Sequence, residues 1–500
     1  MDVSPDNSGT VKVNGSVASS YPSVFSIARY STVTLEAMPA FGYTFSNWSG
    51  AVKGTTNPTS LYVDCDKTVT AAFTPKSDGI SNLYFPHVAS QGGSSPDIWE
   101  TEVCVINTSD QPLSGMLRSY QNNGQAASSG KAITLTAHGR WSRIVGGGEF
   151  TNPSEIGYMV FESASDSVVG YTKFYQEGKY RAAIPAVKEV TASDIYIPHI
   201  ASNAEWYTGL SLVNTTSVTK ELTITFNTGQ SVPYTLNANE HKAFDIASLF
   251  NDQPQPGIQS AVISNASGII GLELFGNIGG SDHLDGILLT DYTASTIYYP
   301  HVAGDGWWTG IVAYNPSKLA CTITVKPYNA QGIPLSPKTR SLVGKGKYIG
   351  LVTELGLPAE TAWFKIDATR PLTGFELFGT VDGNQLAAYA RGGGTGAMAG
   401  VFPKIEKDGW TGIAFVNTED SAASVTLTAY NDSGSAMATQ VLPVDGHAKV
   451  VNPAEAIFSQ NISGATYIAY SSNRNIVGFQ LNGTSDGMML DGLPALSGTH

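Results

Sequence analysis

Cysteine is scarce in this chain, with three among 500 residues, at positions 65, 104 and 321. An odd number at scattered positions provides neither a disulfide framework nor the ligand spacing of a metal site. Cys65, Cys104 and Cys321 each lie in an apolar, strand-like context, so we expect all three to be buried free thiols. The cysteines therefore do not indicate whether the protein resides in an oxidising or a reducing compartment.

Charge is also scarce. Only 14% of the residues are charged, against roughly 25% in typical soluble domains, and the net charge is −13. An acidic chain lacks the basic footprint that nucleic acids require, and it is poorly suited to electrostatic docking on anionic lipid. No apolar run reaches the roughly 18 residues of a membrane-spanning helix. Nucleic-acid partners and a membrane-spanning segment are therefore not expected.

The chain begins Met-Asp-Val-Ser-Pro, without the charged and then apolar segments of a secretory signal. Two interpretations follow: a cytoplasmic protein, or a secreted or cell-surface protein from which the signal peptide has been removed. We favour the second, because glycine, small polar residues and β-branched runs are abundant.

Comparison of the sequence with itself reveals four copies of one unit. A proline recurs in YFPHVA, YIPHIA, YYPHVA and VFPKIE, and an aromatic-Thr step follows in WETEVCVIN, WYTGLSLVN, WWTGIVAYN and WTGIAFVN. Each copy then has a glycine turn, and later a phrase such as VVGYTKF or IIGLELFG. The landmark residues are Pro86, Pro198, Pro300 and Pro403; Asn107, Asn214, Asn315 and Asn417; Gly124, Gly229, Gly332 and Gly434; and Gly170, Gly271, Gly374 and Gly478. Four landmarks in one order, about 100 residues apart, establish four tandem modules.

Each module contains about seven short segments with the period-two alternation of strands. A short helical segment follows the fourth, in DIASLF, GLVTELGLP and NPAEAIF. This composition predicts an all-β protein whose modules are β-sandwiches of immunoglobulin or fibronectin type, at residues 80–190, 191–294, 295–397 and 398–497. A propeller-like closed ring of four repeats is the alternative. The usual blade is shorter than these modules, so we expect independent sandwiches in a semi-rigid row.

Residues 1–76 do not belong to the repeat. The phrase VTLEAMPAFGYTFSNWSG, followed by an Asn-Pro turn and TVTAAF, resembles the divergent internalin B-repeat family of secreted and cell-wall bacterial proteins. The resemblance depends on Gly9, Val33, Leu35, Ala37, Pro39, Gly42, Tyr43, Phe45, Trp48, Gly50, Asn57, Pro58, Val69, Thr70, Ala71 and Phe73. It implies a small β-rich domain of a secreted or surface protein and brings no catalytic residues. Residues 80–497 are similar in style to β-sandwich repeats of bacterial extracellular proteins.

No motif of a serine hydrolase, zinc protease or P-loop enzyme occurs, so we expect no catalytic residues and no enzyme activity. His87, His199 and His301 share one repeated position, where the fourth copy has Lys404. His138, His241 and His447 are assigned to a second one, where the third copy has Lys347. Lysine in place of histidine argues against metal ligation, so no metal site is predicted.

Other polar residues have ordinary structural roles. Glu273 and Glu376 repeat, but Thr172 and Gln480 replace them in the other copies, so they are not a general acid common to all modules. The recurring asparagine is expected to bond its own following backbone and hold the turn. No cofactor is expected, and calcium at the turns 382–384 (DGN) and 484–487 (TSDG) is a minor possibility.

The aromatic-Thr step provides the candidate ligand-binding residues, namely Trp99, Trp206, Tyr207, Trp307, Trp308 and Trp410. Exposed aromatic rings repeated along the chain would stack on sugar rings. The competing interpretation is that each ring fills the end of a sandwich or a joint between modules.

Three functions are compatible with the sequence. We favour a non-catalytic structural stalk or adhesin of a bacterial surface, which binds a protein or glycan partner through its repeated modules. The alternatives are a carbohydrate-binding array that uses the aromatics, and the ancillary region of a secreted enzyme. Unpaired edge strands would also permit self-assembly.

Overall fold

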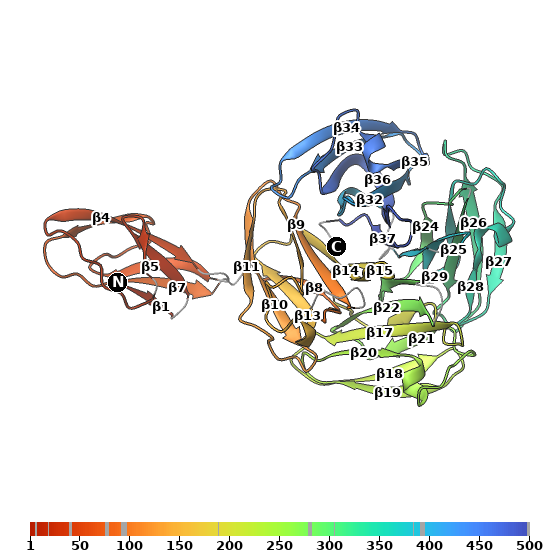
Figure 1. Cartoon of the computed structure of the whole chain (residues 1–500), viewed down its shortest axis with the longest axis horizontal. Helices are drawn as coiled ribbons and strands as arrows, with labels where there is room; N and C mark the ends of the chain where they lie inside the picture. The colour runs from red at the N-terminus through yellow and green to blue at the C-terminus, as the bar shows by residue number, and fades with distance from the viewer. Residues whose placement is uncertain are drawn as a thin grey trace.

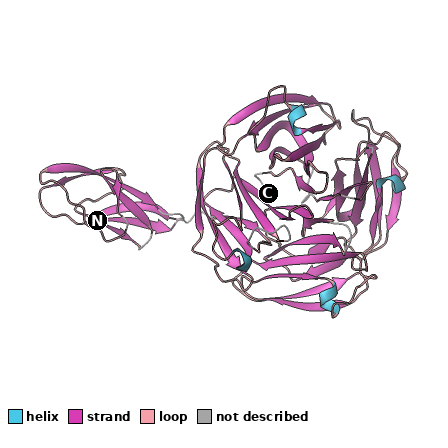
Figure 2. Ribbon diagram, in the orientation of Figure 1, coloured by secondary structure: helices cyan, strands magenta, loops and turns pink. Residues whose placement is uncertain are grey.

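A computed structural model describes residues 1–5, 8–18, 20–39, 43–75, 80–91, 98–188, 190–278, 283–304, 306–383, 385–390 and 396–497. Almost all regular structure is β-strand, as Figure 2 shows, with a short helical turn in each of the four modules. The all-β prediction and the tandem sandwich modules are confirmed. Gly42 and Asn384, which belong to the B-repeat resemblance and to one candidate calcium turn, lie outside the described residues.

The N-terminal domain is formed by two sheets, with strand orders β1-β7-β5 and β3-β2-β4-β6. Their strands are β1 (Asp2–Ser4), β2 (Gly9–Val13), β3 (Ser16–Val17), β4 (Ser31–Pro39), β5 (Tyr43–Gly50), β6 (Thr59–Val63) and β7 (Val69–Pro75). Trp48 is buried at the centre, and its indole N–H donates a hydrogen bond of 3.0 Å to the carbonyl oxygen of Thr56. Cys65 is exposed, so the expectation of a buried thiol is wrong there, whereas Cys104 and Cys321 are buried. Cys65 lies in the segment between β6 and β7, outside both strands.

Module 1 follows with two four-stranded sheets, ordered β11-β10-β13-β8 and β12-β9-β14-β15. Its elements are β8 (Ser81–Phe85), β9 (Glu100–Asn107), β10 (Leu113–Gln121), β11 (Lys131–Leu135), β12 (Arg140–Ile144), η1 (Pro153–Glu155), β13 (Ile156–Ser163), β14 (Val168–Gln176) and β15 (Tyr180–Pro185). Module 2 repeats this order with β16 (Ile195–Ile197), β17 (Trp206–Asn214), β18 (Lys220–Phe226), β19 (Ser231–Leu236), β20 (His241–Asp245), η2 (Ala247–Phe250), β21 (Ala261–Ser264), β22 (Ile269–Asn277) and β23 (Leu284–Leu288).

In modules 3 and 4 one long strand runs through both sheets and joins them. Module 3 contains β24 (Ala294–Tyr299), β25 (Trp307–Tyr314), β26 (Cys321–Tyr328), β27 (Lys338–Leu342), β28 (Lys347–Leu351), η3 (Val352–Leu355), β29 (Trp363–Thr380) and β30 (Leu386–Tyr389). Module 4 contains β31 (Ala397–Phe402), β32 (Gly409–Asn417), β33 (Ala423–Tyr430), β34 (Ala436–Val444), β35 (Lys449–Pro453), α1 (Ala454–Ile457), β36 (Tyr467–Thr484) and β37 (Leu490–Pro494). β24 and β31 begin at the last residue of the preceding predicted module.

The recurring asparagine bonds the backbone that follows it and holds the turn, as predicted. Asn417 is fully buried at the end of β32; its Oδ1 accepts the backbone N–H of Glu419 at 3.1 Å, and its Nδ2 donates to the Ser421 carbonyl at 2.8 Å. The same bonds occur at Asn107, Asn214 and Asn315. One side chain thus satisfies several buried backbone groups at each turn.

The four modules are arranged around a common centre, and module 1 contacts module 4 (Figure 1). The last strands of the modules, β15, β23, β30 and β37, meet there in succession, and β37 packs against β15. At the meeting of modules 1 and 4 the Thr136 hydroxyl donates to the Ser433 carbonyl at 2.7 Å, and the Tyr467 hydroxyl donates to the His138 carbonyl at 2.7 Å. The expected semi-rigid row is therefore wrong. The modules form a ring of two-sheet sandwiches, not a propeller of single-sheet blades.

Candidate functional site

The repeated Pro-His position lies at the joints between neighbouring modules. His87 Nδ1 of module 1 is 3.2 Å from His241 Nε2 of module 2. At the next joint the ammonium of Lys347 donates to His199 Nδ1 at 2.8 Å. Lys449 of module 4 lies near His301 of module 3 in the same way. At these three joints, therefore, the histidine after the repeated proline lies beside His241, Lys347 or Lys449 of the following module.

The strand registers correct one alignment made from the sequence. His241 and Lys347 begin β20 and β28 and pair with the residue before the recurring asparagine, as Arg140 and Lys449 do in their modules. His138 and His447 instead occupy the preceding turn, where their backbone φ angles of 54° and 58° match those of Asn239 and Lys345. His138, His241 and His447 are thus not one repeated position, because His138 and His447 lie two residues before the position that His241 occupies in its module.

Burial controls ionisation at these joints. It lowers the pKa of His87 to about 4 and, together with the charge of Lys347, that of His199 to about 3. It also lowers the pKa of Lys347 and of Lys449 to about 8. The histidines are therefore neutral near pH 7, so His199 Nδ1 can accept the proton that Lys347 donates.

Glu273 and Glu376 are fully buried in strands β22 and β29, close to Lys347 and Lys449. Burial raises the pKa of both carboxyl groups well above the ordinary value, against the opposing charge of each lysine. In module 4 the equivalent Gln480 accepts the Lys404 backbone N–H at 3.3 Å and donates to the Lys404 carbonyl at 2.8 Å. Glu273 and Glu376 occupy the strand position that Gln480 has in module 4, and a protonated glutamic acid has the shape of this amide.

The predicted aromatic residues gather at three of the joints, and all six are half-buried. Trp99 and Tyr207 pack on one apolar cluster between modules 1 and 2, and Trp206 and Trp308 pack on the next cluster, between modules 2 and 3. Trp307 and Trp410 meet edge to face between modules 3 and 4, with ring centroids 6.2 Å apart. The structure therefore brings the six together in pairs, each from two neighbouring modules.

Glycines make room for the second aromatic of each pair. A Cβ atom at Gly276, Gly379 or Gly483 would lie 2.2–2.7 Å from the ring of Tyr207, Trp308 or Trp410 respectively. The ring lies over the glycine opposite it in the adjacent strand. This contact explains why a glycine follows the LELF, FELF and FQLN segments.

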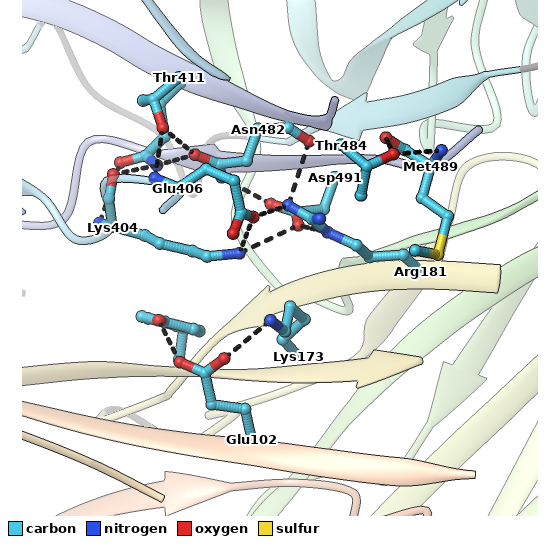
Figure 3. A network of polar contacts seen from close by, with 12 residues as sticks. Glu102, Lys173, Arg181, Lys404, Glu406, Thr411, Asn482, Thr484, Met489 and Asp491 are labelled. Carbon is cyan, nitrogen blue, oxygen red and sulfur yellow. Dashed lines mark hydrogen bonds and ion pairs between the residues drawn. The ribbon is translucent and has the colours of Figure 1, made fainter. Parts of the chain in front are cut away.

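The joint that closes the ring is different, because Glu100 and Gly409 replace the aromatic pair there. Charged side chains fill this joint instead (Figure 3). Arg181 of β15 forms ion pairs with Glu406 and with Asp491 of β37, which is completely buried. The ammonium of Lys404 lies 2.6 Å from Glu406 Oε2 and 3.7 Å from Asp491 Oδ2. The Asn482 amide donates to Asp491 Oδ1 at 2.6 Å.

A second group of charges continues this network within module 1. Lys173 contacts Glu102 at 2.8 Å, and the hydroxyl groups of Tyr171 and Ser142 both donate to Glu102 at 2.7 Å. Although burial opposes ionisation, the charges of Lys173, Lys404 and Arg140 hold the pKa of Glu102 well below its ordinary value. Arg140 also reaches Asp432 of module 4 at 3.0 Å.

The carboxylates of the closing joint are ionised and paired, so they are unsuited to acid–base exchange with a substrate. The pKa of Asp491 is lowered by Arg181, Lys404 and Lys173 despite burial, and that of Glu406 by Lys404 and Arg181. Sequence reasoning missed this network. Glu102 occupies the position of Gly209, Gly310 and Gly412, and that departure from the repeat was the available signal.

A central pit of about 510 Å³ opens where the last strands of all four modules end. Pro185, Leu288, Ala390 and Pro494 line it, from the ends of β15, β23, β30 and β37. Gly271, Gly374 and Gly478 of the repeated phrase also line it. A Cβ atom at Gly374 would lie 2.0 Å from the Val312 carbonyl oxygen, so this repeated glycine allows the strands to approach.

The candidate calcium turn at 484–487 has the hydrogen bonds of an ordinary turn. Asp486 accepts the Thr484 hydroxyl at 2.5 Å and the Met488 backbone N–H at 3.0 Å, as in an ordinary Asx turn. The described residues contain no group of three or more His, Cys, Asp or Glu side chains arranged to hold a metal ion. They also contain no helix with the length and hydropathy to cross a membrane.

Comparison with known proteins identifies the N-terminal domain. Residues 2–77 match the divergent InlB B-repeat domain family, as the resemblance indicated. No curated protein matches the chain.

Three solved structures illustrate how distant the structural matches are. The Bacteroides ovatus mixed-linkage glucan utilization locus protein SGBP-B, in complex with a heptasaccharide, has 12% identity, a TM-score of 0.11, and coverage of 73% of this chain and 89% of that chain. A tetra-tandem repeat from the extending region of a large adhesion protein has 12% identity, a TM-score of 0.10, and coverage of 84% and 100%. Trypsin-activated alpha-2-macroglobulin from Escherichia coli has 9% identity, a TM-score of 0.09, and coverage of 95% and 47%.

Proposed function

We propose that this chain is a non-catalytic binding protein of a bacterial surface or of a secreted multidomain protein. In this proposal the B-repeat domain is a spacer and the four-module ring is the binding head. The central pit carries the proposal, because residues of all four modules line it. A row of modules would offer four similar sites, whereas the ring offers one composite site.

The chemistry of the pit suits an apolar peptide segment of a protein partner. Its wall is mainly aliphatic and includes Val187, Ile270, Leu289, Ile476 and Leu496. Its volume of about 510 Å³ lies within the roughly 300–1,000 Å³ of pockets that bury drug-sized ligands. A few apolar side chains on one strand or turn of a partner would fill this space.

The charge distribution supports binding rather than catalysis. Lys188 and Asp291 are charged lining residues of the pit, and the Asp291 carboxylate already accepts the Ala192 backbone N–H at 2.7 Å. A nucleophile with an adjacent base is the constellation that covalent catalysis requires. The mainly aliphatic lining suits an apolar side chain better than it suits that chemistry.

Selection of binding peptides tests the proposal. A random peptide library is selected against the full chain, with the pit-filled variant Ala495→Trp as the counter-target. We expect apolar peptides that bind the wild type and lose at least tenfold in affinity on the filled variant. The matched control is Val343→Trp, because Val343 is exposed and is not a pit residue; this variant should bind as the wild type does. Peptides that bind all three proteins equally, or no enrichment at all, would contradict binding in the pit.

A further inference from the structure

A second pocket, of about 180 Å³, lies at the joint between modules 3 and 4. Its walls include the two indole rings of Trp307 and Trp410, together with Phe479, Leu481 and Val451, and His301 also lines it. The pocket is smaller than the roughly 300 Å³ lower bound for drug-sized ligands, so it suits a single ring rather than a chain.

The first aromatic residue has a different ring contact here from those at the other joints. Trp99 is stacked on Tyr180, with ring centroids 5.7 Å apart and an interplanar angle of 17°. Trp206 is stacked on His283 at 6.0 Å and 6°. Trp307 instead meets Trp410 edge to face, at an interplanar angle of 87°. Two perpendicular indole walls therefore border this pocket, and no parallel ring among the described residues covers Trp307.

His301 supplies a polar group to this otherwise apolar pocket. Its Nδ1 atom is buried and has no hydrogen-bond partner among the described residues. The imidazole lies against the rings of Phe378 and Phe479, with centroid distances of 5.6 and 5.9 Å. Burial, together with the charge of Lys449, keeps its pKa well below the ordinary value, so the ring is neutral. A buried polar atom without a partner is unfavourable, and a ligand hydroxyl at hydrogen-bond distance would relieve this.

We infer that this pocket binds one neutral pyranose ring of a glycan. The apolar C–H face of a sugar matches an indole wall, and a ring hydroxyl matches His301 Nδ1. A cationic ligand is disfavoured because Lys449 is nearby and the histidine carries no charge. The inference concerns a site separate from the central pit and does not depend on the peptide proposed there.

Titration of the full chain with methyl glycosides of glucose, galactose, mannose and N-acetylglucosamine tests the inference. Tryptophan fluorescence and ligand-observed NMR report binding. We expect at least one glycoside to bind saturably, with a dissociation constant of ~1 mM. Trp307→Ala should weaken that binding at least tenfold. The matched control Trp99→Ala, at the joint between modules 1 and 2, should leave it unchanged.

Two further variants keep the test decisive if Trp307→Ala does not fold. Gly304 lines the pocket, and a Cβ atom there would meet nothing within 4 Å, so Gly304→Phe should block the pocket without disturbing the core. His301→Phe keeps an aromatic ring but removes the polar atom, and should weaken binding about fivefold. Binding in Gly304→Phe equal to the wild type would overturn the assignment.

The remaining outcomes distinguish a sugar in this pocket from a sugar in the pit and from a different ligand in this pocket. The pit-filled Ala495→Trp variant should bind the glycosides normally, and loss of binding there would place the sugar in the central pit. The absence of saturable binding by any of the four glycosides at about 50 mM would overturn the sugar assignment. Preferential binding of N-acetyltryptophanamide, with the same dependence on Trp307, would replace it with an aromatic peptide side chain.

Discussion

Replacement of Arg181 by methionine should open the closing joint of the ring. Asp491 is completely buried, and Arg181 and Lys404 are the cations beside it. Removal of one partner of a buried ion pair typically costs about 3–5 kcal/mol, because it leaves an uncompensated charge. Lys404 at 3.7 Å and the Asn482 amide remain, so we expect the lower end, ~3 kcal/mol, for Arg181→Met.

A surface pair in module 1 provides the control. Arg118 contacts Glu162 at 2.6 Å, but their side chains are 40% and 19% exposed. Arg118→Met should therefore cost only about 0–1 kcal/mol. Urea unfolding followed by tryptophan fluorescence measures both variants, because tryptophans lie at three of the joints.

A double-mutant cycle then tests whether the pair acts as a unit. Asp491→Asn removes the buried charge and keeps the side-chain shape. The double variant Arg181→Met/Asp491→Asn should be more stable than the sum of the single changes predicts, with a coupling of about 1–3 kcal/mol. An Arg181→Met variant no less stable than Arg118→Met, or single effects that add within about 0.5 kcal/mol, would show that this buried pair does not hold the joint closed.

Three further predictions follow from burial and close packing. The pKa of His87 is about 4 in the folded protein and 6.5 ordinarily, so the unfolded chain binds more protons between these values and stability falls as the pH drops below 6.5. One such histidine should lower the free energy of unfolding by about 2 kcal/mol between pH 7 and pH 5. The variant His87→Gln should lose that part of the pH dependence of the urea midpoint. An unchanged pH dependence would count against a neutral buried His87. Gly374→Ala should destabilise the protein by about 2 kcal/mol or more, because its Cβ would meet the Val312 carbonyl at 2.0 Å. The control Gly257→Ala, whose Cβ would meet nothing within 4 Å, should change the stability by no more than about 0.5 kcal/mol in the same urea assay. Equal effects of the two variants would contradict the close approach. A thiol reagent should label only Cys65 in the native protein, because Cys104 and Cys321 are buried and burial raises the pKa of Cys104 to about 12; native labelling that persists in Cys65→Ser would contradict this.

The predictable parts of this protein are those encoded within one module. The alternation of apolar residues predicts the strands, and the position of Asn107 and its equivalents predicts the turn bonds that the structure contains. For the aromatic residues the sequence allows two interpretations, a ligand-binding surface or a joint between modules. It does not choose between them, because adjacent residues on a strand point to opposite faces. Whether the six aromatic residues contact a ligand stays a prediction.

The arrangement of the modules could not be read in the same way. It depends on the angle at which one sandwich meets the next, and that angle arises from contacts such as Lys347 with His199, 148 residues apart. Arg181 and Asp491 are 310 residues apart and have no shared motif. Glu102 stands where the other three modules have a glycine. This replacement was the local sign that module 1 meets its preceding neighbour around the ring, module 4, through charged rather than aromatic side chains.

The two ends of the repeat region lie close together. The order of the modules around the ring therefore does not depend on which module comes first in the chain. Leu83 and Ser497 line the same pit, although they belong to the first and last modules. A circular permutant that joins residue 497 to residue 80 through a short linker, and begins instead between Tyr292 and Thr293, would retain every strand pairing within the modules. The charged joint would then be spanned by the chain, and the Lys347–His199 joint would become the one that closes without a covalent connection.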